Sequence, residues 1–325
     1  MKNGEIRGIG KNCSTDPAQA NWKQTATHSE NAKVTSCAKF LAANLQKAPD
    51  ANQRKRLFKI AEDPSSLTNE VDQALKIANT IPNDTRKSWA LLDISKAFTQ
   101  LNEFDKALKT ANTIPDDTTK SWALQNISNA FTQLNEFDKA LKTANTIPND
   151  TRKSWALQNI SNAFTQLKKF DEALKTANTI PNHITKSEAL SDISKALAQL
   201  NEFDKALETA NKALETANTI PDDTKKSWVL RSISEAFTQL KKFGEALKIA
   251  NKISNPAEKS WALLDISKAF TQQKKFDKAL EIANNALEAA NTIPDDTTKS
   301  WVLRKISEAL KTANAMLDNT SKGPV

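Results

Sequence analysis

The segment that starts at Trp89 carries its apolar residues on one side of a helix. They follow the i, i+3, i+4, i+7 spacing of an amphipathic helix and are Ala90, Leu91, Ile94, Ala97, Phe98 and Leu101. A second stripe with the same spacing consists of Phe104, Ala107, Leu108, Ala111 and Ile114. Asn102 is the expected N-cap of this second helix, and Pro115 ends it. The segment therefore predicts an antiparallel pair of helices.

The same pair returns along the chain. The unit KSWALLDISKAFTQLNEFDKALKTANTIPDDTT starts at Lys87 and has a period of 33 residues, which is typical of stacked helical repeats. Its tryptophan recurs throughout, except that Glu188 takes its place in the fourth copy. Two steps are 40 residues long, because they contain seven extra residues that extend the second helix, NKALETA before Asn218 and NNALEAA before Asn291. Seven residues make nearly two turns, so we expect the second helices of repeats four and six to be longer by about 10 Å.

These repeats resemble a known family. The segment ISKAFTQLNEFDKAL resembles the centre of a tetratricopeptide repeat (TPR), whose pattern is filled by Ile94, Ser95, Ala97, Phe98, Leu101, Phe104, Ala107 and Leu108. Ser95 replaces the small Gly of that pattern, Ala111 replaces a later aromatic residue, the linker is longer and the second helix is shorter. The resemblance covers Lys87 to the C-terminus and implies an all-α fold, an α-solenoid of TPR-like helix-turn-helix repeats wound as a right-handed superhelix.

The chain divides into four predicted parts. Residues 1–30 have little apolar content and are expected to be disordered. Residues 31–86 are expected to form an irregular helical N-terminal cap with a degenerate repeat, including helices at Asn31–Gln46 and Arg54–Ala61. Residues 87–298 form six repeats of 33 or 40 residues, and residues 299–325 form a capping helix that ends before the polar tail DNTSKGPV.

Composition fits this helical class, with 38% hydrophobic residues, 26% charged residues and no Tyr. No stretch approaches the roughly 18 apolar residues of a membrane span, so we expect no membrane partner and a cytoplasmic location, with export as an effector as the alternative. The net charge is +8, but residues 1–86 hold 13 basic and 9 acidic residues, which is half of the excess. Cations in the repeats alternate with Asp and Glu, so nucleic-acid binding is not expected.

The sequence predicts no catalytic residue, metal site or cofactor. His28 lies in the segment expected to be disordered, and His183 lies in a linker. Cys13 and Cys37 are two thiols outside the repeats, too few for a disulfide framework or a zinc site. The pairs Asp116–Asp117, Asp222–Asp223 and Asp295–Asp296 follow a Pro and are expected to cap the next helix.

In TPR arrays the first helices line a concave groove that holds a partner's peptide, and the resemblance implies the same here. Differences between the copies fall mainly three and seven places after each Trp. The proposed groove residues are Trp89, Leu92, Lys96, Trp122, Gln125, Asn129, Trp155, Gln158, Asn162, Ser191, Lys195, Trp228, Arg231, Glu235, Trp261, Leu264, Lys268, Trp301, Arg304 and Glu308. These columns lack the adjacent cations with which some TPR proteins bind a terminal carboxylate, so that activity is not expected.

Two interpretations of the recurring Trp remain open. The indole can lie across the preceding Ile-Pro linker and fix the angle between units, or it can be an anchor for a ligand, because Trp is enriched at binding hot spots. The leading functional hypothesis is a non-enzymatic scaffold that binds a protein or peptide. The alternatives are a self-associating solenoid, in which homo-oligomers form through the ends or convex faces, and a single-stranded RNA-binding repeat protein.

Overall fold

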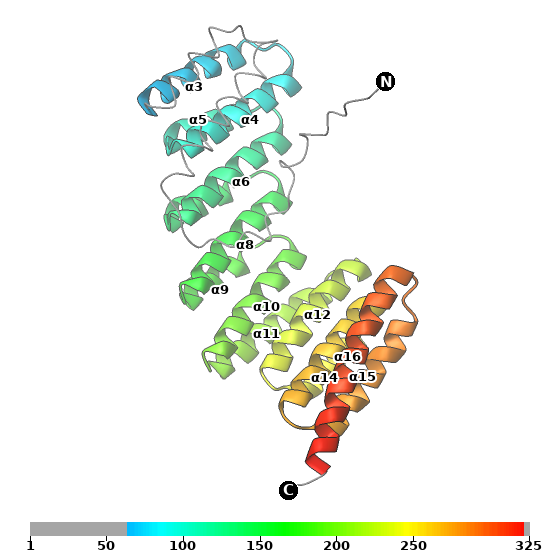
Figure 1. The fold of residues 1–325 in the computed structure, drawn as a ribbon. Helices are drawn as coiled ribbons and strands as arrows, with labels where there is room; N and C mark the ends of the chain where they lie inside the picture. Colours follow the sequence, from blue (N-terminus) through cyan, green and yellow to red (C-terminus); the bar gives the residue numbers. More distant parts are fainter. Residues whose placement is uncertain (1–63, 322–325) are drawn as a thin grey trace, which may run out of the picture. The chain divides into compact units, whose positions relative to one another are not determined.

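The computed structural model describes residues 64–321, and these residues form helices joined by short turns (Figure 1). A boundary between two units of the chain falls after Glu70, inside α3 (Pro64–Asn79), so the described residues from Val71 onward belong to one unit. The helices predicted at Asn31–Gln46 and Arg54–Ala61, and the disorder predicted for residues 1–30, lie outside the described residues.

First and second helices alternate after α3. The first helices have 17 residues each and are α4 (Asp84–Gln100), α6 (Asp117–Gln133), α8 (Asp150–Gln166), α10 (His183–Gln199), α12 (Asp223–Gln239) and α14 (Pro256–Gln272). The second helices are α5 (Phe104–Asn112), α7 (Phe137–Asn145), α9 (Phe170–Asn178), α11 (Phe203–Asn218), α13 (Phe243–Asn251) and α15 (Phe276–Asn291). The chain closes with α16 (Asp296–Ser321).

Each first helix packs against its own second helix and against the next first helix, while each second helix also packs against the following first helix. Of the apolar residues predicted at these contacts, Leu91, Ile94, Phe98, Ala107 and Ala111 are buried. The others of the first unit that lie nearer the surface are half-buried, namely Ala90, Leu101, Phe104 and Leu108. Within the described residues, the protein is thus an all-α solenoid of TPR-like helix-turn-helix repeats, as predicted. The handedness of its winding stays a prediction.

A buried serine hydroxyl joins the two helices of each repeat. Ser95 Oγ donates to the carbonyl oxygen of Ala107 at 3.2 Å, and Ser128 Oγ donates to that of Ala140 at 3.0 Å. The same bond recurs from Ser161, Ser194, Ser234 and Ser267. The Ser that replaces Gly in the TPR pattern therefore has a polar partner in every hairpin from α4 to α15.

The turn between the two helices differs from the prediction. Asn102 is not the N-cap of α5; it has a left-handed backbone with φ of 59° and follows the C-terminus of α4. The amide of Asn102 donates to the carbonyl of Thr99, and the amide of Glu103 donates to that of Phe98, which together form a Schellman motif. Glu103 takes the N-cap position of α5 and makes no side-chain capping bond.

The linker between repeats caps the next first helix. Asp116 is the N-cap of α6, and its carboxylate accepts from Thr119 N at 2.7 Å. Hydrogen bonds from the Thr119 hydroxyl and amide lower the pKa of Asp116. Because capping begins here, the first helix starts at Asp117, earlier than the predicted apolar stripe. Ile114, predicted on the second helix, instead follows the C-cap Thr113 and is buried in the linker.

A second serine fastens the linker to the preceding repeat. The amide of Asp116 donates to Ser88 Oγ at 3.2 Å, across 28 residues. Equivalent bonds join Asn149 to Ser121, Asn182 to Ser154 and Asn255 to Ser227. These four bonds occur at 33-residue steps. At the two 40-residue steps, where Ser187 and Ser260 hold this position, the described residues form no such bond.

The two insertions lengthen second helices as predicted, because α11 and α15 have 16 residues where the other second helices between α5 and α13 have 9. The last helix differs at its end. α16 continues through Asp318 to Ser321, into the tail that was predicted to lie outside it. It begins at Asp296 because Asp295 accepts from Thr298 N, as in the other repeats.

Candidate functional site

The tryptophans form a row on the first helices, which we call the tryptophan row: Trp89, Trp122, Trp155, Trp228, Trp261 and Trp301, with Glu188 in the fourth place. Five of the six indoles are 36–57% exposed, and Trp261 is half-buried. Their positions on neighbouring helices bring some rings together. The ring centroids of Trp89 and Trp122 are 6.2 Å apart with an edge-to-face geometry, and those of Trp261 and Trp301 are 4.8 Å apart.

An arginine joins two indoles in the middle of the row. The guanidinium carbon of Arg152 lies 4.3 Å from the ring centroid of Trp122 and 4.7 Å from that of Trp155. Its Nη1 donates to the side-chain oxygen of Gln125 at 3.1 Å. The sequence prediction missed Arg152, although an Arg three residues before a Trp on one helix is a detectable spacing for a cation–π contact.

The positions three places after each Trp face the neighbouring first helix. Leu92, Ser191 and Leu264 are buried, so their prediction as open groove residues is wrong. Ser191 Oγ donates to the carbonyl of Ser232 on the next first helix at 3.0 Å. Gln125, Gln158 and Arg231 are half-buried, whereas Arg304 on the last helix is exposed. This column is therefore mainly an interface between repeats, because the adjacent helix covers it.

The positions seven places after each Trp are more accessible. Lys96, Asn129, Asn162, Lys195 and Glu235 are half-buried, and Lys268 and Glu308 are exposed. They contact a column that the prediction did not include, four places after the Trp. Asn159 donates to the side-chain oxygen of Asn129 at 3.1 Å, and Lys195 donates to Ser232 Oγ at 3.2 Å. The period of the repeats was sufficient to find this column.

Ion pairs dominate the C-terminal part of this surface. Lys195 lies 3.2 Å from Asp192 and 3.1 Å from Glu235, and its side chain is only 17% exposed. Burial alone would lower the pKa of Lys195, but the two carboxylates outweigh it and the pKa is raised. Burial also raises the pKa of Asp265, against the opposing charges of Lys268 and Arg231. The charges on α10, α12 and α14 thus largely neutralise one another.

Glu188 interrupts the row as predicted from the sequence. It accepts a long hydrogen bond of 3.5 Å from Gln158 on the preceding first helix. Burial raises the pKa of Glu188, the Gln158 amide opposes this shift, and the charge of Asp192 adds to it. The row is therefore divided into two Trp-bearing parts by a carboxyl group, and burial disfavours the charged form of that group.

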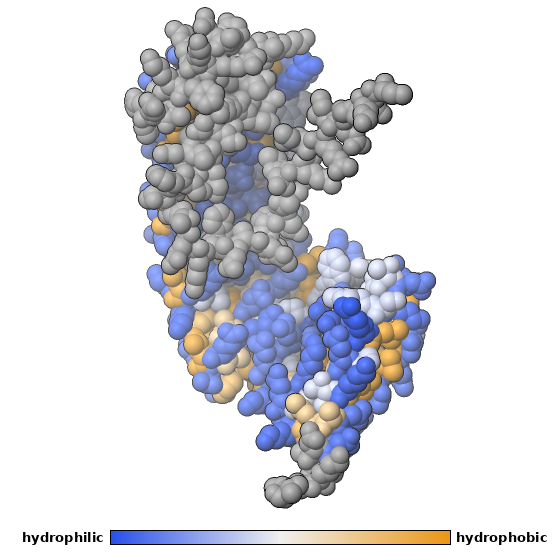
Figure 2. Space-filling view, in the orientation of Figure 1, coloured by the Kyte–Doolittle hydropathy of each residue, from blue (hydrophilic) through white to orange (hydrophobic). Residues whose placement is uncertain are grey.

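The surface has two kinds of hollow. One, of about 540 Å³, lies between α12 and α14 and includes the predicted groove residues Glu235 and Lys268, together with Asp265, Gln239 and Gln272. The view in Figure 2 shows mostly hydrophilic residues over α10 to α16, with smaller hydrophobic groups between them. The hollow between α12 and α14 is therefore lined mainly by polar and charged side chains.

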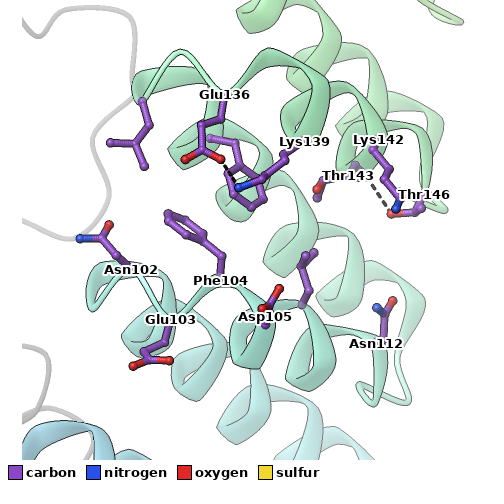
Figure 3. Close-up of a pocket in the computed structure, with 13 residues that line it drawn as sticks. Asn102, Glu103, Phe104, Asp105, Asn112, Glu136, Lys139, Lys142, Thr143 and Thr146 are labelled. Carbon is purple, nitrogen blue, oxygen red and sulfur yellow. Dashed lines mark hydrogen bonds and ion pairs between the residues drawn. The ribbon is translucent and has the colours of Figure 1, made fainter. Parts of the chain in front are cut away.

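Another hollow, of about 830 Å³, lies on the side of the second helices between α5 and α7. Phe104 points into it, and Glu136 and Lys139 line its opposite side (Figure 3). The Phe104 and Phe131 rings stack with centroids 4.4 Å apart. None of the predicted groove residues lines this hollow. It is a gap between neighbouring short second helices.

The described residues contain no group of three or more His, Cys, Asp or Glu side chains that could hold a metal ion. His183 is the first residue of α10 rather than a linker residue, and its Nδ1 lies 2.7 Å from Thr219 Oγ1. Among the described helices, none combines the length and apolar content needed to cross a bilayer.

No protein-family model and no curated protein matches the chain. Several solved structures are similar to it. Ton1535 from Thermococcus onnurineus is 16% identical, with 85% of this chain and 91% of that chain covered and a TM-score of 0.33. A tetratricopeptide repeat protein from Parabacteroides merdae is 14% identical, with 88% and 99% covered and a TM-score of 0.33.

The TPR2AB-domain:pHSP90 complex of yeast Sti1 is also similar, at 18% identity, with 88% of this chain and 99% of that chain covered and a TM-score of 0.28. TM-scores below 0.5 do not establish a common overall arrangement. The assignment to TPR-like repeats therefore rests on the period, helix pairs and contacts of this chain itself.

Proposed function

We propose that the protein is a non-enzymatic scaffold that binds a protein or peptide partner along the tryptophan row and the columns beside it. The observation that carries this proposal is the exposure of five indoles at the same position of their repeats, on α4, α6, α8, α12 and α16. Exposed Trp is costly to keep in water and is the residue most enriched at binding hot spots. The adjacent Asn, Gln and charged side chains supply hydrogen-bonding groups for a polypeptide.

The ring contacts between neighbouring repeats also support the structural interpretation of the Trp residues. A double variant, Trp122→Ala with Trp155→Ala, tests the two roles separately. If the indoles are ligand anchors, pull-down with the variant loses the partner while the melting temperature changes little. If they only hold repeats together, the melting temperature falls by several degrees.

The matched control is Leu134→Ala with Leu167→Ala, since both leucines are exposed and lie away from the row. Partners retained by the wild type and by this control, but not by the Trp variant, support the scaffold. Equal recovery with all three proteins would contradict it.

Self-association through the C-terminal end is a second candidate, because α16 packs against α14 and α15 but, among the described residues, has no second helix of its own repeat. Ser307 is exposed, whereas the equivalent serines from Ser95 to Ser267 are buried. Leu303 and Leu310 are half-buried where Leu91 and Phe98 are fully buried. Light scattering over a concentration series tests this candidate: a monomer at all concentrations excludes it, and an oligomer that is lost in Leu310→Lys supports it.

Single-stranded RNA binding is a weaker candidate that no observed site favours. Ion pairs neutralise much of the row from α10 to α14, whereas RNA binding needs an uncompensated positive surface. Fluorescence titration with mixed RNA at physiological salt is expected to show no binding.

A further inference from the structure

The guanidinium of Arg152 is held at a fixed place with most of its donors unused. Among the described residues, its side chain contacts the two indoles of Trp122 and Trp155 and makes one hydrogen bond, to Gln125. A guanidinium has five N–H donors, and stacking on aromatic rings leaves them at its edge. The edge of Arg152 is therefore available to a hydrogen-bond acceptor.

The contact between the corresponding positions three repeats later contains a carboxylate. There Arg231, three places after Trp228, pairs with Glu258, three places before Trp261, at 3.1 Å. Between α6 and α8, Gln125 takes the position of Arg231 and Arg152 takes that of Glu258, so the arginine lies on the other helix of the pair and its partner is a neutral amide. The protein supplies a carboxylate to one arginine and not to the other.

Arg152 is also isolated from other charges along the row. The positions three, four and seven places after Trp on α6 and α8 are all amides, namely Gln125, Asn126, Asn129, Gln158, Asn159 and Asn162. Burial without a neighbouring carboxylate lowers the pKa of Arg152, yet a guanidinium remains charged in proteins. An anionic ligand would recover the interactions that Arg152 loses when it leaves bulk water.

We propose that Arg152, held by Trp122 and Trp155, binds the side-chain carboxylate of an Asp or Glu in the partner. This subsite rests on the proposed function and specifies the chemistry of the ligand. A planar carboxylate matches the edge of a guanidinium and can accept two parallel hydrogen bonds. The surrounding amides donate to and accept from the backbone of the same segment, and the exposed indole faces contact its apolar side chains.

The test is the selection of peptides from a random library displayed as fusions without a free C-terminus, using the full chain as bait. Wild type is expected to enrich sequences with an acidic residue at a fixed place between apolar residues. Arg152→Gln is expected to lose this acidic preference while still enriching peptides. Arg86→Gln is the matched control, because Arg86 lies three places before Trp89 and is exposed.

A selected peptide and its Glu→Gln analogue are then titrated against the same proteins by intrinsic Trp fluorescence. The analogue should bind wild type roughly tenfold more weakly or worse, and bind Arg152→Gln no differently from the parent peptide. Arg152→Lys keeps the positive charge but lacks the planar guanidinium. It should therefore show only part of the wild-type difference in affinity between the peptide and its analogue.

Enrichment of sequences without an acidic residue, or an acidic preference unchanged in Arg152→Gln, would contradict the carboxylate subsite at Arg152 but not the proposed scaffold function. Enrichment of no sequence by wild type would contradict the scaffold itself, and the subsite with it. Melting curves of each variant separate these outcomes from unfolding.

Discussion

Ser128 Oγ donates to the carbonyl oxygen of Ala140 at 3.0 Å, and this bond crosses from the first helix of a repeat to the second. Both residues are fully buried. The carbonyl of Ala140 already accepts a hydrogen bond within its own helix, so the bond from Ser128 is an additional one. It gives the buried serine hydroxyl a hydrogen-bond partner. The hydroxyl thus lets a polar side chain be buried between α6 and α7 without an unpaired group.

We expect Ser128→Ala to lower the free energy of unfolding by about 1 kcal/mol, because one buried hydrogen bond is lost. Urea denaturation followed by circular dichroism measures the change. Ser307→Ala is the matched control, since Ser307 has the same place in its repeat but is exposed. A change within about 0.5 kcal/mol is expected there; equal effects at both sites would contradict the role of the hydroxyl.

The left-handed turn residues predict a stabilising substitution. Lys168 has φ of 59°, a conformation that costs a residue with a Cβ about 1 kcal/mol and costs Gly or Asn less. Lys168→Gly should therefore raise the free energy of unfolding by about 0.5 kcal/mol after the entropy of Gly in the unfolded chain is subtracted. Asn102→Gly should change it less, because Asn already tolerates this backbone.

Thermal melting of both variants provides the measurement. Lys175→Gly on α9 is the opposite control, since a Gly in an exposed helical position should destabilise by about 1 kcal/mol. A loss of stability in Lys168→Gly would mean that the lysine side chain makes a contribution larger than its backbone strain.

Glu188 predicts a pH-dependent difference in melting temperature between the wild type and a Glu188→Gln variant. Burial raises its pKa in the folded protein, so folding disfavours the charged form. The resulting loss of stability is complete above the folded pKa, and it disappears as the pH falls to the pKa of the unfolded chain. Glu188→Gln should therefore melt at a higher temperature than wild type near neutral pH, and the two should converge in acid.

A rise of roughly 2–4 °C would correspond to about 1 kcal/mol in an array of this size. Differential scanning calorimetry across the acidic range gives the comparison. Glu172→Gln, at an exposed position on α9, is expected to match wild type at each pH. A neutral-pH melting temperature lower in Glu188→Gln than in wild type would show that the charged carboxylate stabilises the fold.

Much of the fold could be predicted because each repeat buries its own apolar stripes. Ile94, Phe98 and Ala107 have the helical spacing that places them between two helices, and the inserted seven residues preserve that spacing. Asn102 was harder, since Asn suits both an N-cap and a left-handed C-terminal residue. Hydrogen bonds to the preceding helix decided between them.

The site was less predictable because it depends on neighbouring repeats. A helical wheel places Leu92 and Leu264 away from the second helix, but the adjacent first helix covers both. Arg152 belongs to α8 and contacts Trp122 of α6, which a single repeat cannot reveal. Residues that act across a boundary between repeats therefore require the structure.

The serine bonds to the linkers predict where the array opens. The amides of Asp116, Asn149, Asn182 and Asn255 are held by a serine of the preceding repeat, whereas those of Asp222 and Asp295 have no such bond among the described residues. Hydrogen exchange should be faster at Asp222 and Asp295 than at the other four amides. Ser121→Ala should bring the amide of Asn149 to a comparable rate, and equal rates at all six positions in wild type would contradict this prediction.

Among the described residues, the linkers that follow the longer second helices thus lack the serine bond that holds four other linkers. Under tension, we expect the linkers after α11 and α15 to extend before the four linkers that a serine holds. By this reasoning, each seven-residue duplication makes one linker of an otherwise uniform array easier to extend.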